Sequence, residues 1–127
     1  MKPEDRRRLK QHIEMIVDVK ECSKKIDKES FIRLSNNLIS NAIKYNNVSG
    51  KITIKLDSEK FIVSDNGIGI KKDKQKDIFK RFFRANDVQG GFGIGLSIVY
   101  EICKEYNIDI DMKSSENKGT TFTLRFN

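Results

Sequence analysis

The pattern of hydrophobic and polar positions predicts a chain in which helices and strands follow one another. In the helical segments apolar residues recur three or four positions apart, and in the strands they alternate with polar residues. Helices are expected over residues 3–19, 27–45, 77–84 and 93–106, and strands over residues 22–26, 51–56, 60–64, 108–113 and 121–126. Hairpins with intervening helices are typical of an α+β fold, in which an antiparallel-rich sheet carries helices on one face.

Residues with strong local preferences mark the ends of these segments. Asp27 is expected to be the N-cap of the second helix, with the acidic Glu29 in its first turn. Short polar turns at residues 57–59 and 117–119 join neighbouring strands into hairpins. Residues 85–91 are polar and contain glycine, which predicts a mobile loop before the last helix.

The composition is that of one soluble domain. The chain has 127 residues, of which 37% are hydrophobic and 34% are charged. The formal net charge is +7, but the lysines are spread along the chain without interleaved aromatic residues, so solvated surfaces are expected and nucleic acid is not. The apolar runs are too short to cross a bilayer, which predicts a cytoplasmic domain whose parent protein could still be membrane-anchored.

The two cysteines do not have the spacing of a metal site. Cys22 and Cys103 form no Cys-x-x-Cys pair, and the chain has a single histidine, so the sequence does not indicate bound zinc. Cys103 lies at helical spacing with Val99 and Ile102. This predicts a buried thiol in a reducing compartment.

The helix over residues 27–45 carries a polar stripe that is a candidate for function. Asn37, Asn41 and Lys44 lie at positions i, i+4 and i+7, and the apolar residues fall on the opposite arc. An amide oxygen can ligate Mg²⁺ and a lysine can meet a phosphate. Any amphipathic helix has a polar face, however, so the stripe alone is equally consistent with a solvated surface.

Two glycine-bearing turns are the other candidates. Asp65 follows a strand directly and opens the turn 66–70, where an ordinary turn and a ligand site are both possible. A carboxylate between isoleucines could accept a hydrogen bond from an exocyclic amine. Residues 90–97 lead from several glycines into a helix, an arrangement in which backbone N–H groups can approach phosphates. The spacing matches neither a dinucleotide-binding fold nor a P-loop.

In their order along the chain, these segments resemble the ATPase domain shared by histidine kinases, gyrase, Hsp90 and the mismatch-repair protein MutL. Residues 37–45 resemble the N box, 65–70 the G1 box, 78–84 the F box, 91–96 the G2 box and 119–122 the final glycine–threonine strand. The F box favours histidine kinases over the other branches, and the resemblance covers residues 26–126.

The resemblance implies a two-layer α/β sandwich of the Bergerat type, with a mixed, mostly antiparallel sheet, helices on one face and residues 85–92 as a flexible ATP lid. It implies ATP and Mg²⁺ as ligands, with Asn41 on the metal and Asp65 on the adenine amino group. The nucleotide-binding residues that it implies are Asn37, Asn41, Lys44, Tyr45, Asp65, Gly67, Gly69, Ile70, Phe82, Arg84, Gly91, Gly93, Gly95, Leu96 and Thr120.

The resemblance also implies a catalytic set of Asn37, Lys44 and Arg84, in which Lys44, Arg84 and Tyr45 contact the phosphate and sugar side of the nucleotide. Asn37 stands where the ATP-hydrolysing branches have a glutamate that activates water. Asparagine takes no proton near neutral pH. Slow hydrolysis is therefore expected, which suits a domain that passes the γ-phosphoryl group to a histidine.

The implied function is that of the Mg-ATP-binding catalytic domain of a two-component sensor histidine kinase. The acceptor histidine would lie on a separate helical dimerisation domain, with a response regulator downstream. His12 lacks the acceptor motif, so the chain alone is not expected to autophosphorylate. Residues 1–26 are expected to be an N-terminal helix and a truncated first-strand region left from a linker or dimerisation segment, and residues 27–127 the ATPase domain.

Two other functions share much of this pattern. A stand-alone serine kinase of the anti-sigma-factor type has the same N and G boxes, although the F box argues against it. A regulatory module that binds nucleotide without catalysis would keep the same fold.

Overall fold

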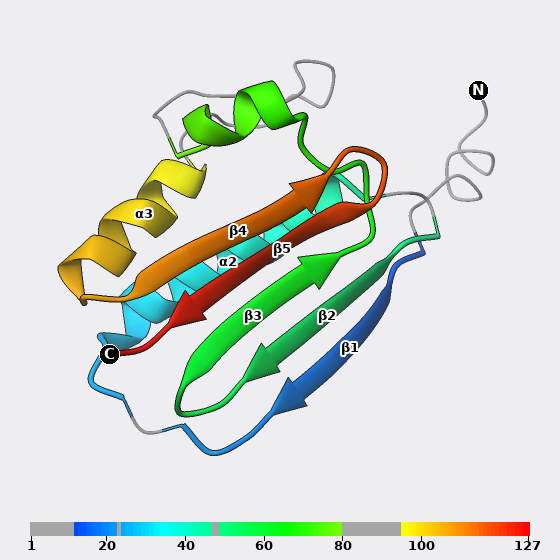
Figure 1. Cartoon of the computed structure of the whole chain (residues 1–127). Coiled ribbons are helices and arrows are strands. Elements are labelled where there is room, and N and C mark those ends of the chain that lie inside the picture. The colour runs from blue at the N-terminus through cyan, green and yellow to red at the C-terminus, as the bar shows by residue number, and fades with distance from the viewer. Residues whose placement is uncertain (1–11, 23, 47–48, 80–94) are drawn as a thin grey trace, which may run out of the picture.

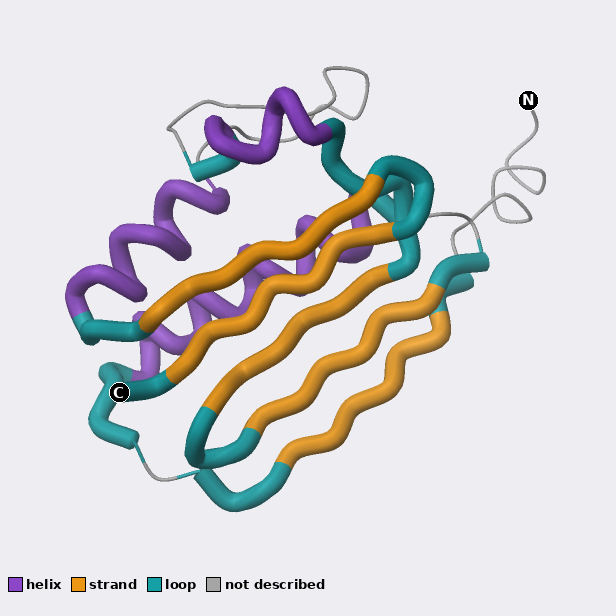
Figure 2. Tube along the Cα trace, viewed as in Figure 1, coloured by secondary structure: helices purple, strands orange, loops and turns teal. Residues whose placement is uncertain are grey.

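The computed structural model describes residues 12–22, 24–46, 49–79 and 95–127, which form two layers (Figure 1). One layer is a five-stranded sheet of order β1-β2-β3-β5-β4, and the other contains the helices, which lie on one face of the sheet (Figure 2). The elements are β1 (Glu14–Val19), α2 (Lys28–Lys44), β2 (Lys51–Leu56), β3 (Lys60–Asp65), the 3₁₀ helix η1 (Lys72–Asp77), α3 (Gly95–Glu105), β4 (Asp109–Ser115) and β5 (Gly119–Arg125).

The sheet is mixed and mostly antiparallel, which confirms the predicted α+β class. β1 runs parallel to β2, and the pairs β2–β3, β3–β5 and β4–β5 are antiparallel. The carboxylate of Asp57 closes the β2–β3 hairpin by accepting hydrogen bonds from the backbone N–H groups of Glu59 (2.8 Å) and Lys60 (2.9 Å). These bonds lower the pKa of Asp57, because they stabilise its charged form.

Helix α2 begins where its sequence predicts. Asp27 is the N-cap, and its side chain accepts a hydrogen bond from the backbone N–H of Ser30 (3.1 Å). The apolar arc of α2 is buried against the sheet through Leu34, Leu38 and Ala42. The helix therefore turns one flank of its polar side toward α3, with which it packs.

The core lies between the helices and the sheet. Its buried hydrophobic residues are Leu34, Leu38, Ala42, Ile52, Ile54, Phe61, Val63, Ile78, Val99, Ile102, Cys103, Ile108, Phe122 and Leu124. The predicted burial of the Cys103 thiol is confirmed, and this burial raises its pKa to about 11. The thiol is therefore protonated and unreactive at neutral pH.

The expected helix over residues 3–19 is wrong in its described part, because Glu14–Val19 is strand β1. β1 pairs in parallel with β2 over six positions, so that Val17 lies beside Ile54 and Val19 beside Leu56. Its β-branched residues suit a strand, and pairing with β2 outweighs the weak helical spacing. The division of the chain at residue 26 remains a prediction, although the sheet includes this earlier strand.

Two shorter expectations also differ from the structure. Residues 22–26 form no strand in their described part, where the backbone N–H of Ile26 bonds to the carbonyl of Lys24 instead. The helix expected from residue 77 to 84 does not begin at Asp77, because the 3₁₀ helix η1 ends there and residues 78–79 form a turn. Residues 80–84 lie outside the described residues. Within the described ranges no helix is long and apolar enough to cross a membrane.

The turn between β4 and β5 contains two residues with positive φ, Asn117 (66°) and Gly119 (110°). A Cβ atom on Gly119 would lie 2.0 Å from the carbonyl oxygen of Asp65, at the end of β3. Asn117 already accommodates a side chain. Gly119 is therefore required by close packing as well as by its backbone conformation.

We expect Gly119→Ala to lower the free energy of unfolding by about 2–4 kcal/mol, because left-handed strain and a clash with the backbone act together. Asn117→Ala, in the same turn, is the control, with an expected cost of about 1 kcal/mol or less from left-handed strain alone. Urea denaturation of both variants measures the difference. Equal losses would contradict the packing role of Gly119.

Candidate functional site

Three polar side chains meet at one end of the sheet, on the face that carries the helices. Each occupies the inward-facing position next to a run of alternating apolar residues: Asp65 ends β3, Thr120 is the second residue of β5 and Ser114 is the next to last residue of β4. Asp65 lies opposite Thr120, and Thr120 lies opposite Ser114. The alternation that builds the core therefore also places a polar cluster beyond its edge.

The carboxylate of Asp65 is held by backbone donors on one oxygen. Its Oδ1 accepts hydrogen bonds from the N–H groups of Gly67 (2.9 Å) and Thr120 (3.3 Å). Burial raises the pKa of Asp65, and the two hydrogen bonds oppose that rise without cancelling it. Among the described residues no donor bonds to Oδ2, so this oxygen can accept an N–H from a ligand.

Ser114 joins three elements through one hydroxyl group. Its Oγ accepts a hydrogen bond from the backbone N–H of Ile70 (2.8 Å) and donates to the carbonyl of Gly119 (3.0 Å). Since a serine hydroxyl has one proton, the hydroxyl of Thr120, 2.8 Å away, then donates to Ser114. Thr120 is 7% exposed and is the one buried polar side chain in the described part of the chain.

The turn after Asp65 packs closely against the end of α2 on one side and the end of β4 on the other. A Cβ on Gly67 would lie 2.2 Å from the carbonyl oxygen of Tyr45, at the end of α2, and that oxygen accepts the N–H of Ile68 (2.9 Å). On the other side, Gly69 has φ of 69°, and its Cβ would lie 2.0 Å from the carbonyl oxygen of Ser115. Both glycines allow backbone to approach backbone, which an ordinary hairpin turn does not require.

The predicted asparagine stripe lies on the flank of α2 that meets α3. Asn37 and Asn41 are half-buried, while Lys44 is exposed. A Cβ on Gly95, the first residue of α3, would lie 3.3 Å from the side-chain oxygen of Asn37. The first glycine of α3 and the first asparagine of the stripe are therefore neighbours.

The structure thus brings seven of the predicted residues into two groups. Asp65, Gly67, Gly69, Ile70 and Thr120 surround the end of the sheet, and Asn37 adjoins Gly95 between the helices. The carbonyl of Tyr45 links α2 to the first group, and Leu96 packs against the core. Phe82, Arg84, Gly91, Gly93 and the predicted lid lie outside the described residues.

Three polar residues of this region were missed in the sequence. Ser114 could have been found, because it continues the inward positions Ile110 and Met112. Asn66 supports the turn by accepting the N–H of Lys51 on its side-chain oxygen (2.7 Å). Gln75 bonds to two carbonyl groups, and its place in a polar, lysine-rich segment gives no sign of this role.

Comparison with known proteins gives a family and a fold. The model of histidine kinase-, DNA gyrase B-, and HSP90-like ATPases matches residues 26–127. The sensor histidine kinase WalK of Bacillus subtilis (strain 168) is 35% identical over 126 residues, which cover 90% of this chain and 21% of WalK. The chain therefore spans about a fifth of the length of this relative.

Two solved structures have the same fold. A mycobacterial sensor histidine kinase, MprB, superposes with a TM-score of 0.81 at 24% identity, covering 97% of this chain and 88% of MprB. The catalytic domain of histidine kinase ThkA superposes with a TM-score of 0.76 at 25% identity, covering 97% of this chain and 82% of the other. These likenesses agree with the two-layer sandwich that was predicted.

We expect Ser114→Ala to lower the free energy of unfolding by about 1–3 kcal/mol, because it leaves the Ile70 N–H and the Gly119 carbonyl without their partner. Ser64→Ala is the matched control on the opposite face of the sheet, where one hydrogen bond of 2.7 Å to Thr121 is lost. Its expected cost is below about 1 kcal/mol. Urea denaturation compares the two variants. A larger loss of unfolding free energy for Ser64→Ala would contradict the role of Ser114 in joining three segments.

Proposed function

The chain belongs to the family of histidine kinase-, DNA gyrase B- and HSP90-like ATPases, and from this premise we propose that the end of its sheet binds the adenine of Mg-ATP. The observation that carries the proposal is the geometry of Asp65. Its Oδ1 is held by the N–H groups of Gly67 and Thr120, and no donor in the described part of the chain bonds to Oδ2, which we assign to the ligand. The exocyclic amine of adenine is a donor of the required kind.

The proposed phosphate half lies between α2 and α3. Gly95 begins α3, so the backbone N–H groups of its first turn and the positive end of the helix face this side. Asn37 adjoins Gly95, and Lys44 is exposed on the same flank of α2. The predicted Arg84 and the glycines Gly91 and Gly93 would complete this half.

Magnesium fits this donor set through amide and phosphate oxygens. Within the described ranges no cluster of three histidine, cysteine or acidic side chains could hold a metal alone. Mg²⁺ accepts one or two protein oxygens when phosphates and water supply the others. Asn41 is half-buried one turn from Asn37 and would supply such an oxygen, and the metal would neutralise phosphate charge.

We further propose that the nucleotide is held for transfer and is hydrolysed slowly. Asn37 cannot act as a general base near neutral pH. The γ-phosphoryl group would instead pass to a histidine of a separate helical domain of a longer, cytoplasmic or membrane-anchored kinase, and then to a response regulator. His12 is exposed beside β1 and is not on a helix, so it is a poor candidate for the acceptor.

Asp65→Asn tests the adenine site. Asparagine keeps an acceptor for the two backbone donors but presents an N–H₂ group to the adenine amine, so we expect the dissociation constant of Mg-ADP to rise about tenfold or more. Calorimetric titration measures it. Unchanged affinity would show that Asp65 does not bind the base.

The raised pKa of Asp65 predicts how binding and stability depend on pH. The ligand needs the carboxylate, so affinity should fall as the pH falls through the raised pKa. In the free protein the fold favours the protonated form, so charging Asp65 costs stability as the pH rises through that pKa. Without ligand, Asp65→Asn should therefore melt higher than the wild type at neutral pH, and the difference should shrink in mild acid. A lower melting temperature for the variant at neutral pH would contradict this.

Phosphotransfer tests the kinase proposal. The chain is incubated with Mg-ATP and the helical domain of a related histidine kinase, and the product is treated with acid. We expect a phosphorylated acceptor whose label is lost in acid, because phosphohistidine is acid-labile. Replacement of the acceptor histidine by alanine is the control. An acid-stable label would instead indicate the serine kinase.

A further inference from the structure

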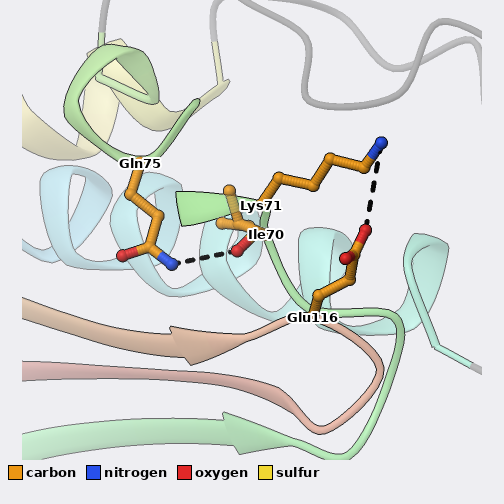
Figure 3. Close-up of polar contacts among 4 residues, drawn as sticks. All are labelled: Ile70, Lys71, Gln75 and Glu116. Atoms are coloured by element: carbon orange, nitrogen blue, oxygen red, sulfur yellow. Dashed lines mark hydrogen bonds and ion pairs between the residues drawn. The ribbon is translucent and has the colours of Figure 1, made fainter. Parts of the chain in front are cut away.

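Gln75 lies on η1, and one nitrogen of its side chain links two other segments. Its Nε2 donates to the carbonyl of Ile70 (2.9 Å; Figure 3) and to the carbonyl of Ser114 (3.1 Å). The two protons of a single amide group therefore join the segment that leaves the glycine turn to strand β4.

These two hydrogen bonds close a ring of contacts with the adenine side of the site. Ile70 and Ser114 are also joined directly, since the N–H of Ile70 donates to Ser114 Oγ (2.8 Å). From Ser114 the network continues to the hydroxyl of Thr120, and the backbone N–H of Thr120 donates to Asp65 Oδ1. A continuous path of hydrogen bonds thus runs from η1 to the carboxylate proposed to bind the base.

Lys71, the residue before η1, makes a second link, to Glu116 in the turn after β4, but this link is more exposed to solvent. Lys71 Nζ and Glu116 Oε2 are 3.9 Å apart, and their side chains are 63% and 53% exposed (Figure 3). An exposed ion pair at this distance contributes little. The hydrogen bonds of Gln75 are partly buried. If they are lost, water is less able to replace them at the two carbonyl groups, so their loss costs more than that of the ion pair.

We infer that Gln75 is a positioning residue for adenine recognition, which rests on the proposed function. By holding Ile70 and Ser114 together, Gln75 keeps Thr120 and Asp65 in the geometry in which Oδ2 faces the ligand. Gln75 itself does not touch the base. This role requires a side chain that donates hydrogen bonds to two carbonyl oxygens. Lysine has N–H donors for this purpose, whereas the carboxylate of glutamate only accepts.

The test uses Gln75→Glu, Gln75→Lys and, as the matched control, Lys71→Met, which removes only the exposed ion pair. Dissociation constants for Mg-ADP and Mg-GDP are measured by competition, well below the melting temperature of each variant. Guanine has a carbonyl oxygen at C6, where adenine has its amine, so the binding of Mg-GDP does not include the hydrogen bond from that amine to Asp65.

Gln75→Glu places a carboxylate against two carbonyl oxygens, and we expect it to raise the dissociation constant for Mg-ADP about tenfold while changing that for Mg-GDP less than about threefold. Gln75→Lys should restore Mg-ADP binding to within about threefold of the wild type, and Lys71→Met should remain within about twofold.

Wild-type affinity in Gln75→Glu, or equal weakening of both nucleotides, would overturn the role of Gln75 and leave the proposed function standing. Failure of Gln75→Lys to bind better than Gln75→Glu would also overturn it. Absence of Mg-ADP binding by the wild-type chain would instead remove the proposed function, and the inference with it.

Discussion

The close approach of the turn after β3 to the turn between β4 and β5 is the constraint on which the site depends. Gly69 and Gly119 both have positive φ, and each would place a Cβ atom 2.0 Å from a carbonyl oxygen of the facing segment. At this separation the N–H of Asn117 reaches the carbonyl of Ile68 (2.6 Å), and Thr120 reaches Asp65. Side chains at the two glycines would force the turns apart and open the cluster.

Asp65 shows how such a site trades stability against binding. A carboxylate that is partly removed from water is destabilised unless hydrogen bonds replace the lost solvation. Here two backbone donors serve one oxygen, and burial still raises the pKa of the group. A ligand amine that donates to Oδ2 would supply a further hydrogen bond and so stabilise the charged carboxylate. A site in which both oxygens were already satisfied would be more stable without ligand and would bind it less well.

The sequence was sufficient for the parts of this protein that rest on local patterns. Alternation located β2–β5, and the N-cap residue located α2, because both report which face of an element is buried. It failed at β1, whose edge position leaves every residue exposed, so burial imposes no clear alternation. It also missed Gln75, whose role comes from carbonyl groups that the fold brings to it, and Ser114, although Ser114 continues the inward alternation of β4. Asp65 was predicted both from its position at the end of a strand and from its resemblance to a family pattern.

Helix α2 contacts both halves of the proposed site. Its end carries the Tyr45 carbonyl that receives Ile68, and one flank carries Asn37 beside Gly95. In the proposed base half, backbone groups and short side chains are joined by hydrogen bonds, so little conformational freedom would remain to be lost on binding of a base. The proposed phosphate half depends on the first turn of α3 and on the half-buried side chains of Asn37 and Asn41. In the proposed function, binding of the base is therefore largely preorganised, and the nucleotide and its metal would complete the geometry needed for transfer.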